Sequence, residues 1–185
     1  MVIDSKVLYL ALVVLVAAQR FAELGKSADH EAALRARGAI EHAPGQMRWM
    51  RLLHGAWLVA APLEVFLFKR PFVLWIAIAA SVVFLIGQAL RLWTQRTLGV
   101  RWTVKIMTLS GIPPVAEGPF RHLRHPNYLG VALEIAALPM IHGAWLTAIV
   151  FSAANAALMF ARISAEEEAL DRAATLAVPR TRSAW

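Results

Sequence analysis

Five long apolar segments dominate the pattern of hydrophobic and polar residues along the chain. About 20 consecutive apolar residues span the hydrocarbon core of a bilayer as a helix. Because each segment comes near that length, the pattern predicts an all-α integral membrane protein with about five transmembrane helices. We expect residues 1–185 to form a single domain. The predicted spans are residues 7–24, 52–68, 72–90, 127–142 and 144–163.

The last two apolar segments are separated by almost no polar sequence. The fourth segment is short and contains Pro139, and His142-Gly143 leaves almost no room for a loop before the fifth. Two helices joined by so short a connection are antiparallel neighbours. We therefore expect a C-terminal helical hairpin.

Composition agrees with a membrane protein, since 59% of the residues are hydrophobic against about 45–50% in soluble domains. The formal charge of +7 is spread over the segments between spans, which indicates contact with membrane lipids and not with nucleic acid. The chain has no Cys and no His pair at H-x-x-x-H spacing, so we expect no metal site. No obligate protein partner is indicated.

Lys and Arg are distributed unevenly between the two sides, and positive residues favour the cytoplasmic side. If the N-terminus lies outside, the outer side holds only Lys6, Lys69 and Arg70, which leaves sixteen of the nineteen for the inner side. This predicts a polytopic protein of a bacterial-type inner or plasma membrane, with the C-terminus and the charged connections in the cytoplasm.

The polar segments predict three further features. Ser27 suits the N-cap and Gly38 the C-terminal end of a short separate helix over residues 28–37. Residues 93–126 are rich in Arg, Trp, Gly and Pro, and a connection of that length is uncommon without a function. We expect an irregular tail over residues 175–185.

The densest chemistry lies between Gly118 and Tyr128. Pro126 suits the first position of a helix, so Arg121, Arg124 and His125 gather where free backbone N–H groups favour an anion. A carboxylate or phosphate would dock there. The alternative is that these side chains only contact lipid headgroups.

A second polar cluster lies at the C-terminal end of the fifth span. Arg162 and Glu166 share a helix face, and Glu167 follows directly. Because the last two spans form a hairpin, this cluster lies at the same depth as His125. The sequence therefore predicts that basic residues, a histidine and carboxylates converge; the alternative is a solvated helix end with ordinary ion pairs.

Glu64, Glu134 and Asn155 are polar residues that stand inside the predicted spans. Polar groups are costly in hydrocarbon and are functional candidates by default. We expect Glu134 to face the hairpin partner or a substrate cavity, Asn155 to contact substrate or to join helices, and Glu64 to pair with Lys69 or Arg70. The seven Trp residues mostly fall near predicted membrane boundaries and are interpreted as interfacial anchors.

The combined motifs over residues 98–170 resemble the isoprenylcysteine carboxyl methyltransferase family. They are the run from Gly118 to Tyr128, a membrane hairpin with Glu134 and Pro139, and Arg162 followed by the Glu166-Glu167 pair. Members of that family are polytopic membrane enzymes that use S-adenosylmethionine. The chain differs from the family pattern at Phe120, where Tyr is common, and at Ile112, where many relatives have His.

Motifs in the first half of the chain, and one shortly before Gly118, point to a smaller group within that family. Arg20-Phe-Ala-Glu23, Arg37-Gly-Ala-Ile-Glu41, Leu53-His54 and Arg101-Trp102-Thr103 resemble the bacterial branch that methylates alkylated pyrones and resorcinols. The resemblance implies cytoplasmic cofactor-binding loops and a lipophilic substrate that enters from the bilayer.

The resemblance also implies roles for single residues. Arg121, His125, Tyr128, Glu166 and Glu167 would bind S-adenosylmethionine, while Arg124, Arg162 and Glu167 would act at the catalytic, substrate-facing end. Glu134 and Asn155 are further substrate candidates. No role is implied for a metal.

The expected activity is methyl transfer to a carboxyl, enol or phenol oxygen of an isoprenylcysteine-like, alkylpyrone-like or alkylresorcinol-like lipid. An already anionic oxygen needs mainly alignment in a water-poor site, whereas a phenol needs a base such as His125 or a Glu. Two alternatives stay open: an NADPH-dependent lipid or sterol-type reductase, and a non-enzymatic membrane scaffold or transport component.

Overall fold

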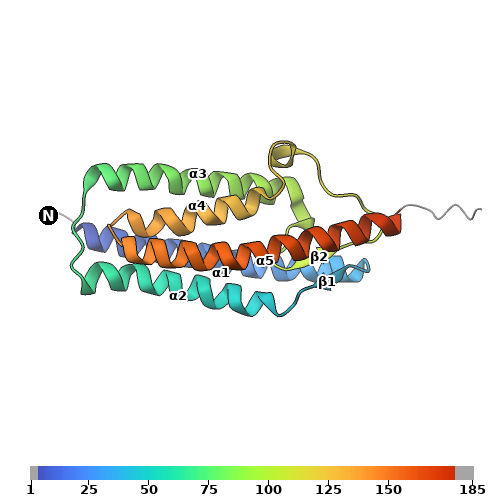
Figure 1. The fold of residues 1–185 in the computed structure, drawn as a ribbon, viewed down its shortest axis with the longest axis horizontal. Coiled ribbons are helices and arrows are strands. Elements are labelled where there is room, and N and C mark those ends of the chain that lie inside the picture. The colour runs from blue at the N-terminus through green and yellow to red at the C-terminus, as the bar shows by residue number, and fades with distance from the viewer. Residues whose placement is uncertain (1–3, 178–185) are drawn as a thin grey trace, which may run out of the picture.

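The computed structural model describes residues 4–177, and their helices form one elongated bundle (Figure 1). The five α-helices confirm the predicted all-α membrane fold. The expected irregular tail is helical up to Ala177 and otherwise lies outside the described residues. The helices are α1 (Ser5–Ala36), α2 (Gln46–Leu67), α3 (Leu74–Leu98), α4 (Pro126–Met140) and α5 (Trp145–Ala177).

Among the described residues, four helices are long and apolar enough to cross a membrane, namely α1, α2, α3 and α5. Large apolar side chains such as Leu15, Leu85 and Phe160 stay exposed on them, as lipid-facing residues do. α4 is shorter, about 22 Å long at 1.5 Å per residue, and it packs mainly against α3 and α5. It is the short fourth segment that the sequence indicated.

The predicted hairpin of α4 and α5 is present. α4 ends after Pro139, and Gly143 adopts a positive φ of 71° in the turn between the two helices. Glu64 of α2 accepts hydrogen bonds from the backbone N–H groups of Leu146 and Thr147, and pairs with Arg70 at 2.9 Å. The carboxylate therefore satisfies free N–H groups at the start of α5, and the expected pairing with Arg70 is confirmed.

The prediction of a separate helix over residues 28–37 is wrong. α1 continues without a break to Ala36, and Ser27 lies buried within it, where its hydroxyl donates to Glu31 and accepts from the backbone N–H of Val104. Ser27 has a tertiary partner and is not a helix cap. The expected end at Gly38 is confirmed, because Gly38 has a φ of 85°.

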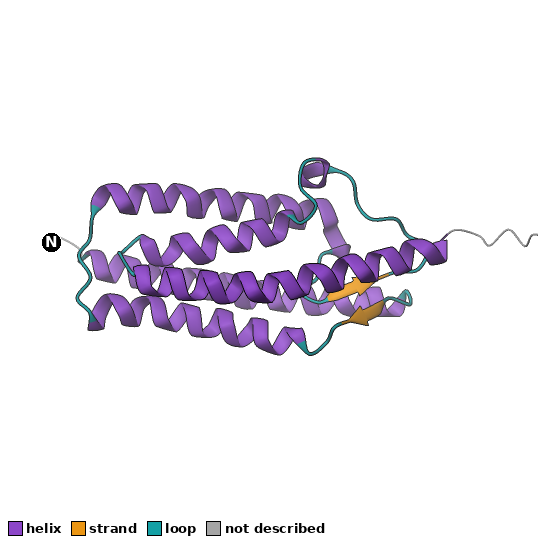
Figure 2. Cartoon of the chain, in the orientation of Figure 1, coloured by secondary structure: helices purple, strands orange, loops and turns teal. Residues whose placement is uncertain are grey.

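The long connection between α3 and α4 is shorter and more ordered than expected. α3 runs past residue 90 to Leu98 because Arg91, only 4% exposed, is paired inside the bundle. Strand β2 (Ile106–Thr108) then pairs antiparallel with β1 (Ile40–His42), with Glu41 opposite Met107 (Figure 2). Two short 3-10 helices, Gly99–Arg101 and Gly118–Arg121, complete the connection.

Two Trp residues are not the interfacial anchors that the sequence indicated. Trp57 is 1% exposed, and its indole N–H donates to the carbonyl oxygen of Ile135 at 3.1 Å. Trp102 is also buried. Trp57 thus joins α2 to α4 in the apolar core, beside Val13, Phe84 and Leu138.

Two glycines set the close packing of α3 on α4. A Cβ atom added at Gly130 would lie 2.5 Å from the Arg91 Cγ and 2.9 Å from the Gly87 carbonyl oxygen. Small residues allow helix backbones to approach in this way in membrane proteins.

We expect Gly130→Ala to lower the free energy of unfolding by about 1–3 kcal/mol through overpacking. The matched control is Gly25→Ala, because an added Cβ there meets nothing within 4 Å. Thermal unfolding in detergent, followed by Trp fluorescence, measures both. Equal melting temperatures for the two variants would contradict the close contact.

Candidate active site

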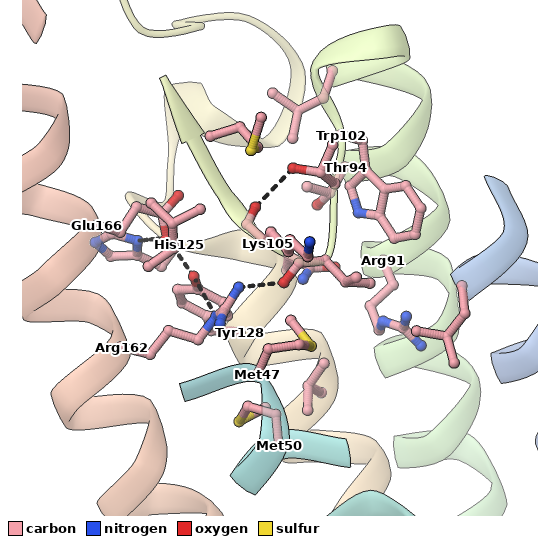
Figure 3. A pocket seen from close by; sticks show the side chains of 18 of the residues that line it. Met47, Met50, Arg91, Thr94, Trp102, Lys105, His125, Tyr128, Arg162 and Glu166 are labelled. Carbon is pink, nitrogen blue, oxygen red and sulfur yellow. Dashed lines mark hydrogen bonds and ion pairs between the residues drawn. The ribbon is translucent and has the colours of Figure 1, made fainter. Parts of the chain in front are cut away.

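The first residues of α4 and residues 162–167 of α5 lie against each other, as the sequence predicted. The Nε2 atom of His125 lies 3.2 Å from Glu167 Oε1. The Tyr128 hydroxyl donates to Glu166 and accepts from the Nε of Arg162 at 3.1 Å (Figure 3). His125 and Pro126 are the N-cap and first residue of α4, so the helix start holds these side chains toward α5.

Aromatic contacts hold the same cluster together. The rings of His125 and Tyr128 stack with centroids 5.6 Å apart and planes 15° apart. The Arg162 guanidinium lies 5.8 Å from the Tyr128 ring centroid and also donates to the backbone carbonyl of Val104. Arg162 therefore connects the hairpin to the connection that precedes it.

A cavity of about 420 Å³ opens beside this cluster and runs into the bundle. At its polar end the lining residues are Arg124, His125, Tyr128, Arg162 and Glu166. Farther in, its walls are apolar and come from α1, α2 and α4, as with Ala17, Phe21, Leu24, Leu58 and Val131. The cavity thus suits a molecule, or two molecules together, with polar and lipophilic parts.

Residues 102–108, here called the strap, form one wall of the cavity. The carbonyl of Trp102 accepts from His30 Nδ1 at 2.7 Å, and Lys105 forms ion pairs with Glu31 at 3.0 Å and Glu41 at 3.3 Å. The hydrogen bond with Glu31 is the main reason that the pKa of Lys105 is raised, with Glu41 adding to it. The long extension of α1 thereby anchors the strap.

The predicted site residues do not all reach the cavity. Among the described residues, Arg124, His125, Tyr128, Arg162 and Glu166 line it, whereas Arg121 and Glu167 do not. The side chain of Arg124 is 89% exposed and lies 3.8 Å from Glu167. Glu167 does not line the cavity itself, but it contacts His125, which does.

Glu134 faces neither the hairpin partner nor the cavity, contrary to the expectation. It is 1% exposed and pairs with Arg20 of α1 and, at 3.1 Å, with Arg91 of α3. The reason is electrostatic: a carboxylate inside an apolar bundle needs a cation, and α1 and α3 supply two. Asn155 is buried too, its Oδ1 has no partner among the described residues, and it does not line the cavity.

These charges form a network that the sequence did not reveal. Glu23 pairs with Arg20 at 2.7 Å and with Arg91 at 2.6 Å, so two carboxylates balance two guanidiniums. Arg20 and Arg91 also line the cavity. The available signal was the Arg20/Glu23 pair at i,i+3 spacing within an apolar segment, together with a lone Glu134 that needed a partner.

The strap and α2 supply further lining residues that the sequence motifs did not identify as site residues. They include Met47, Met50, His54, Trp102 and Lys105. His54 and Trp102 belong to the motifs that resemble the bacterial branch, but only the folded chain places them in the same cavity as Tyr128.

Together, the apolar helices and the cavity with one polar end indicate an integral membrane protein with an internal cavity. The chain belongs to the isoprenylcysteine carboxyl methyltransferase (ICMT) family, whose model matches residues 72–172. The matched region contains α4, most of α5 and the strap. Membership assigns the chain to the membrane methyltransferases.

Two relatives resemble nearly the whole chain. "Uncharacterized protein YpbQ" from Bacillus subtilis (strain 168) is 35% identical over 160 residues, which cover 86% of this chain and 94% of that protein. An "Uncharacterized protein" from Haemophilus influenzae is 30% identical over 152 residues, which cover 82% of this chain and 88% of that protein. No solved structure gives a significant match.

We expect Glu134→Ala to cost about 3–5 kcal/mol of stability, because it leaves Arg20 and Arg91, both largely buried, to share the single carboxylate of Glu23. The control is Glu117→Ala, since Glu117 is exposed and its loss should stay within about 0.5 kcal/mol. Chemical or thermal unfolding in detergent measures both. If Glu134→Ala unfolds like Glu117→Ala, the network contributes no stability.

Proposed function

We propose that the protein is an S-adenosylmethionine-dependent O-methyltransferase that acts on a lipophilic acceptor. The observation that carries the proposal is a cavity with a polar end built by His125, Tyr128, Arg162 and Glu166 and with inner walls that are largely apolar. Methyl transfer requires a polar cofactor and a lipophilic acceptor to meet at one place. A cavity with two such ends provides that place.

The polar end has groups that fit the cofactor. Trp102 Nε1 and Asn127 Oδ1 are buried without a hydrogen-bond partner among the described residues, and both residues line the cavity. They offer one donor and one acceptor to a bound molecule. Glu166, close to Tyr128, offers a carboxylate toward a cationic sulfonium or amino group.

The residues that would hold the cofactor are therefore His125, Tyr128 and Glu166. Glu167 would position His125 through their 3.2 Å contact, and Arg121 would lie nearby on the short helix before α4. When bound, S-adenosylmethionine would supply a methyl group whose C–S bond breaks as the acceptor oxygen forms its bond to carbon, leaving a neutral thioether.

Charge on the cavity wall favours an acceptor that carries or develops negative charge. Seven lining residues are Arg or Lys and one is Glu. Arg162 and Arg124 are the cations beside the cofactor candidates, so they are the groups to orient a carboxylate, enolate or phenolate oxygen. Isoprenylcysteine-like, alkylpyrone-like and alkylresorcinol-like lipids all combine such an oxygen with an apolar chain.

The proposed placement is a polytopic one in a bacterial-type inner or plasma membrane. The connections between α1 and α2 and between α3 and α4 lie at the same end of the bundle as the end of α5, opposite the N-terminus (Figure 1). Since these connections hold most of the Lys and Arg residues, that end would face the cytoplasm. Cofactor would then arrive from the cytoplasm and acceptor from the bilayer.

The test is methyl transfer from isotopically labelled S-adenosylmethionine to lipid extracts, read by mass spectrometry. We expect His125→Ala and Glu167→Ala to lower turnover at least about 100-fold, the typical loss when one polar group of a site is removed, while both variants stay folded. Calorimetric titration of the cofactor separates loss of binding from loss of turnover.

Glu168→Ala is the matched control for Glu167→Ala. Glu168 is the next residue along α5, but its carboxylate pairs with Arg172 and its side chain is 65% exposed. It should keep its turnover. Unchanged turnover in both site variants, or binding of NADPH in place of S-adenosylmethionine, would contradict the proposal.

A further inference from the structure

His54 is a second histidine of the cavity, and it lies away from the Tyr128 cluster in sequence. It belongs to α2, and it lines the cavity together with Met50 and Gly55, which lie on the same helix. A Cβ atom added at Gly55 would meet nothing within 4 Å. The helix therefore leaves open space in the cavity at Gly55, the residue that follows His54.

One hydrogen bond sets the tautomer of His54. Its Nδ1 lies 2.7 Å from the backbone carbonyl oxygen of Met50. A carbonyl oxygen only accepts, so Nδ1 must carry the hydrogen. In the neutral ring Nε2 then holds a lone pair, and it has no hydrogen-bond partner among the described residues. The ring is thus oriented and keeps one basic nitrogen for a ligand.

His125, by contrast, has carboxylates at both ring nitrogens. Its Nε2 lies 3.2 Å from Glu167 and its Nδ1 lies 3.8 Å from Glu166. Each ring nitrogen of His125 therefore already faces a carboxylate, so neither is left without a partner for an acceptor hydroxyl. This arrangement suits cofactor binding and leaves the task of a base to another residue.

We infer that His54 is the general base that removes the proton of a hydroxyl acceptor, so that the acceptor is a phenol or enol and not a carboxylic acid. The inference rests on the proposed methyl transfer. A carboxylate is already ionised near neutral pH and needs no base, whereas a phenol, with a pKa of about 10, does.

The reaction balances as follows. The acceptor O–H gives its proton to His54 Nε2 while the oxygen takes the methyl group, and the imidazolium later releases that proton to water. The Met50 carbonyl stabilises the ring as it becomes positive, in the way a fixed acceptor orients a catalytic histidine. The charged side chains that act on the His54 ring electrostatically are Arg20, Arg162 and Glu23.

The decisive experiment uses the full chain in lipid nanodiscs with two acceptors of equal chain length, a long-chain alkylphenol and a long-chain carboxylic acid. His54→Asn places an amide N–H where Nδ1 lies, so the bond to Met50 can persist, but it supplies no base. His54→Gln places an amide near Nε2 and serves as a second variant should the first fold poorly. His122→Asn, at an exposed histidine outside the cavity, is the control.

We expect His54→Asn to lower kcat for the alkylphenol about 10²–10⁴-fold, the usual contribution of a general base, with cofactor binding within about twofold of wild type. Its rate should also rise about tenfold per pH unit between about pH 7 and 9, because the phenol then ionises by itself. A merely structural role would lower the rate without that pH dependence.

Two results would overturn the inference. One is an equal loss for both acceptors without a pH-dependent recovery, and the other is a wild-type enzyme that methylates only the carboxylic acid. In either case the proposed methyltransferase activity stands. That activity itself fails only if wild-type protein binds no S-adenosylmethionine and methylates neither acceptor, which the same titrations and assays report separately.

Discussion

Charge compensation inside an apolar bundle is the constraint on which the structure depends. A guanidinium or carboxylate in hydrocarbon is tolerated only when it is paired and hydrogen-bonded. Glu23, Arg20, Arg91 and Glu134 meet this condition together, because each carboxylate contacts both guanidiniums. The network joins α1 to α3 and α4, and two of its members form part of the cavity wall.

The glycine contact and the hairpin place the chemistry around that network. Gly87 and Gly130 let α3 and α4 approach closely, which brings Arg91 within reach of Glu134. The short turn at Gly143 returns α5 along α4, so that Glu166 and Arg162 meet Tyr128. A scaffold or transport component has no need for a tyrosine hydroxyl that is shared between a carboxylate and a guanidinium beside a cavity.

Two histidines of the cavity have opposite environments, and the difference supports a division of tasks. His125 lies between two carboxylates on α5, whereas His54 donates to a carbonyl of its own helix and keeps Nε2 available. Pairs of titratable groups with different surroundings often mark separate roles in catalysis. Both histidines line one cavity, which has the cofactor candidates at one end and largely apolar walls farther in.

The sequence by itself determined the membrane class, the hairpin and the meeting of its polar ends, because each rests on local properties: apolar length, a two-residue connection and helix periodicity. It also indicated His125, Tyr128, Arg162 and Glu166 before their contacts were known. Only the tertiary structure decided that Glu134 turns to Arg20 and Arg91, that Ser27 belongs inside one long helix, and that β2 and the strap close the cavity beside His54. Those features depend on partners 40 to more than 100 residues away in the chain, and no local pattern specifies which distant partner a buried polar group will find.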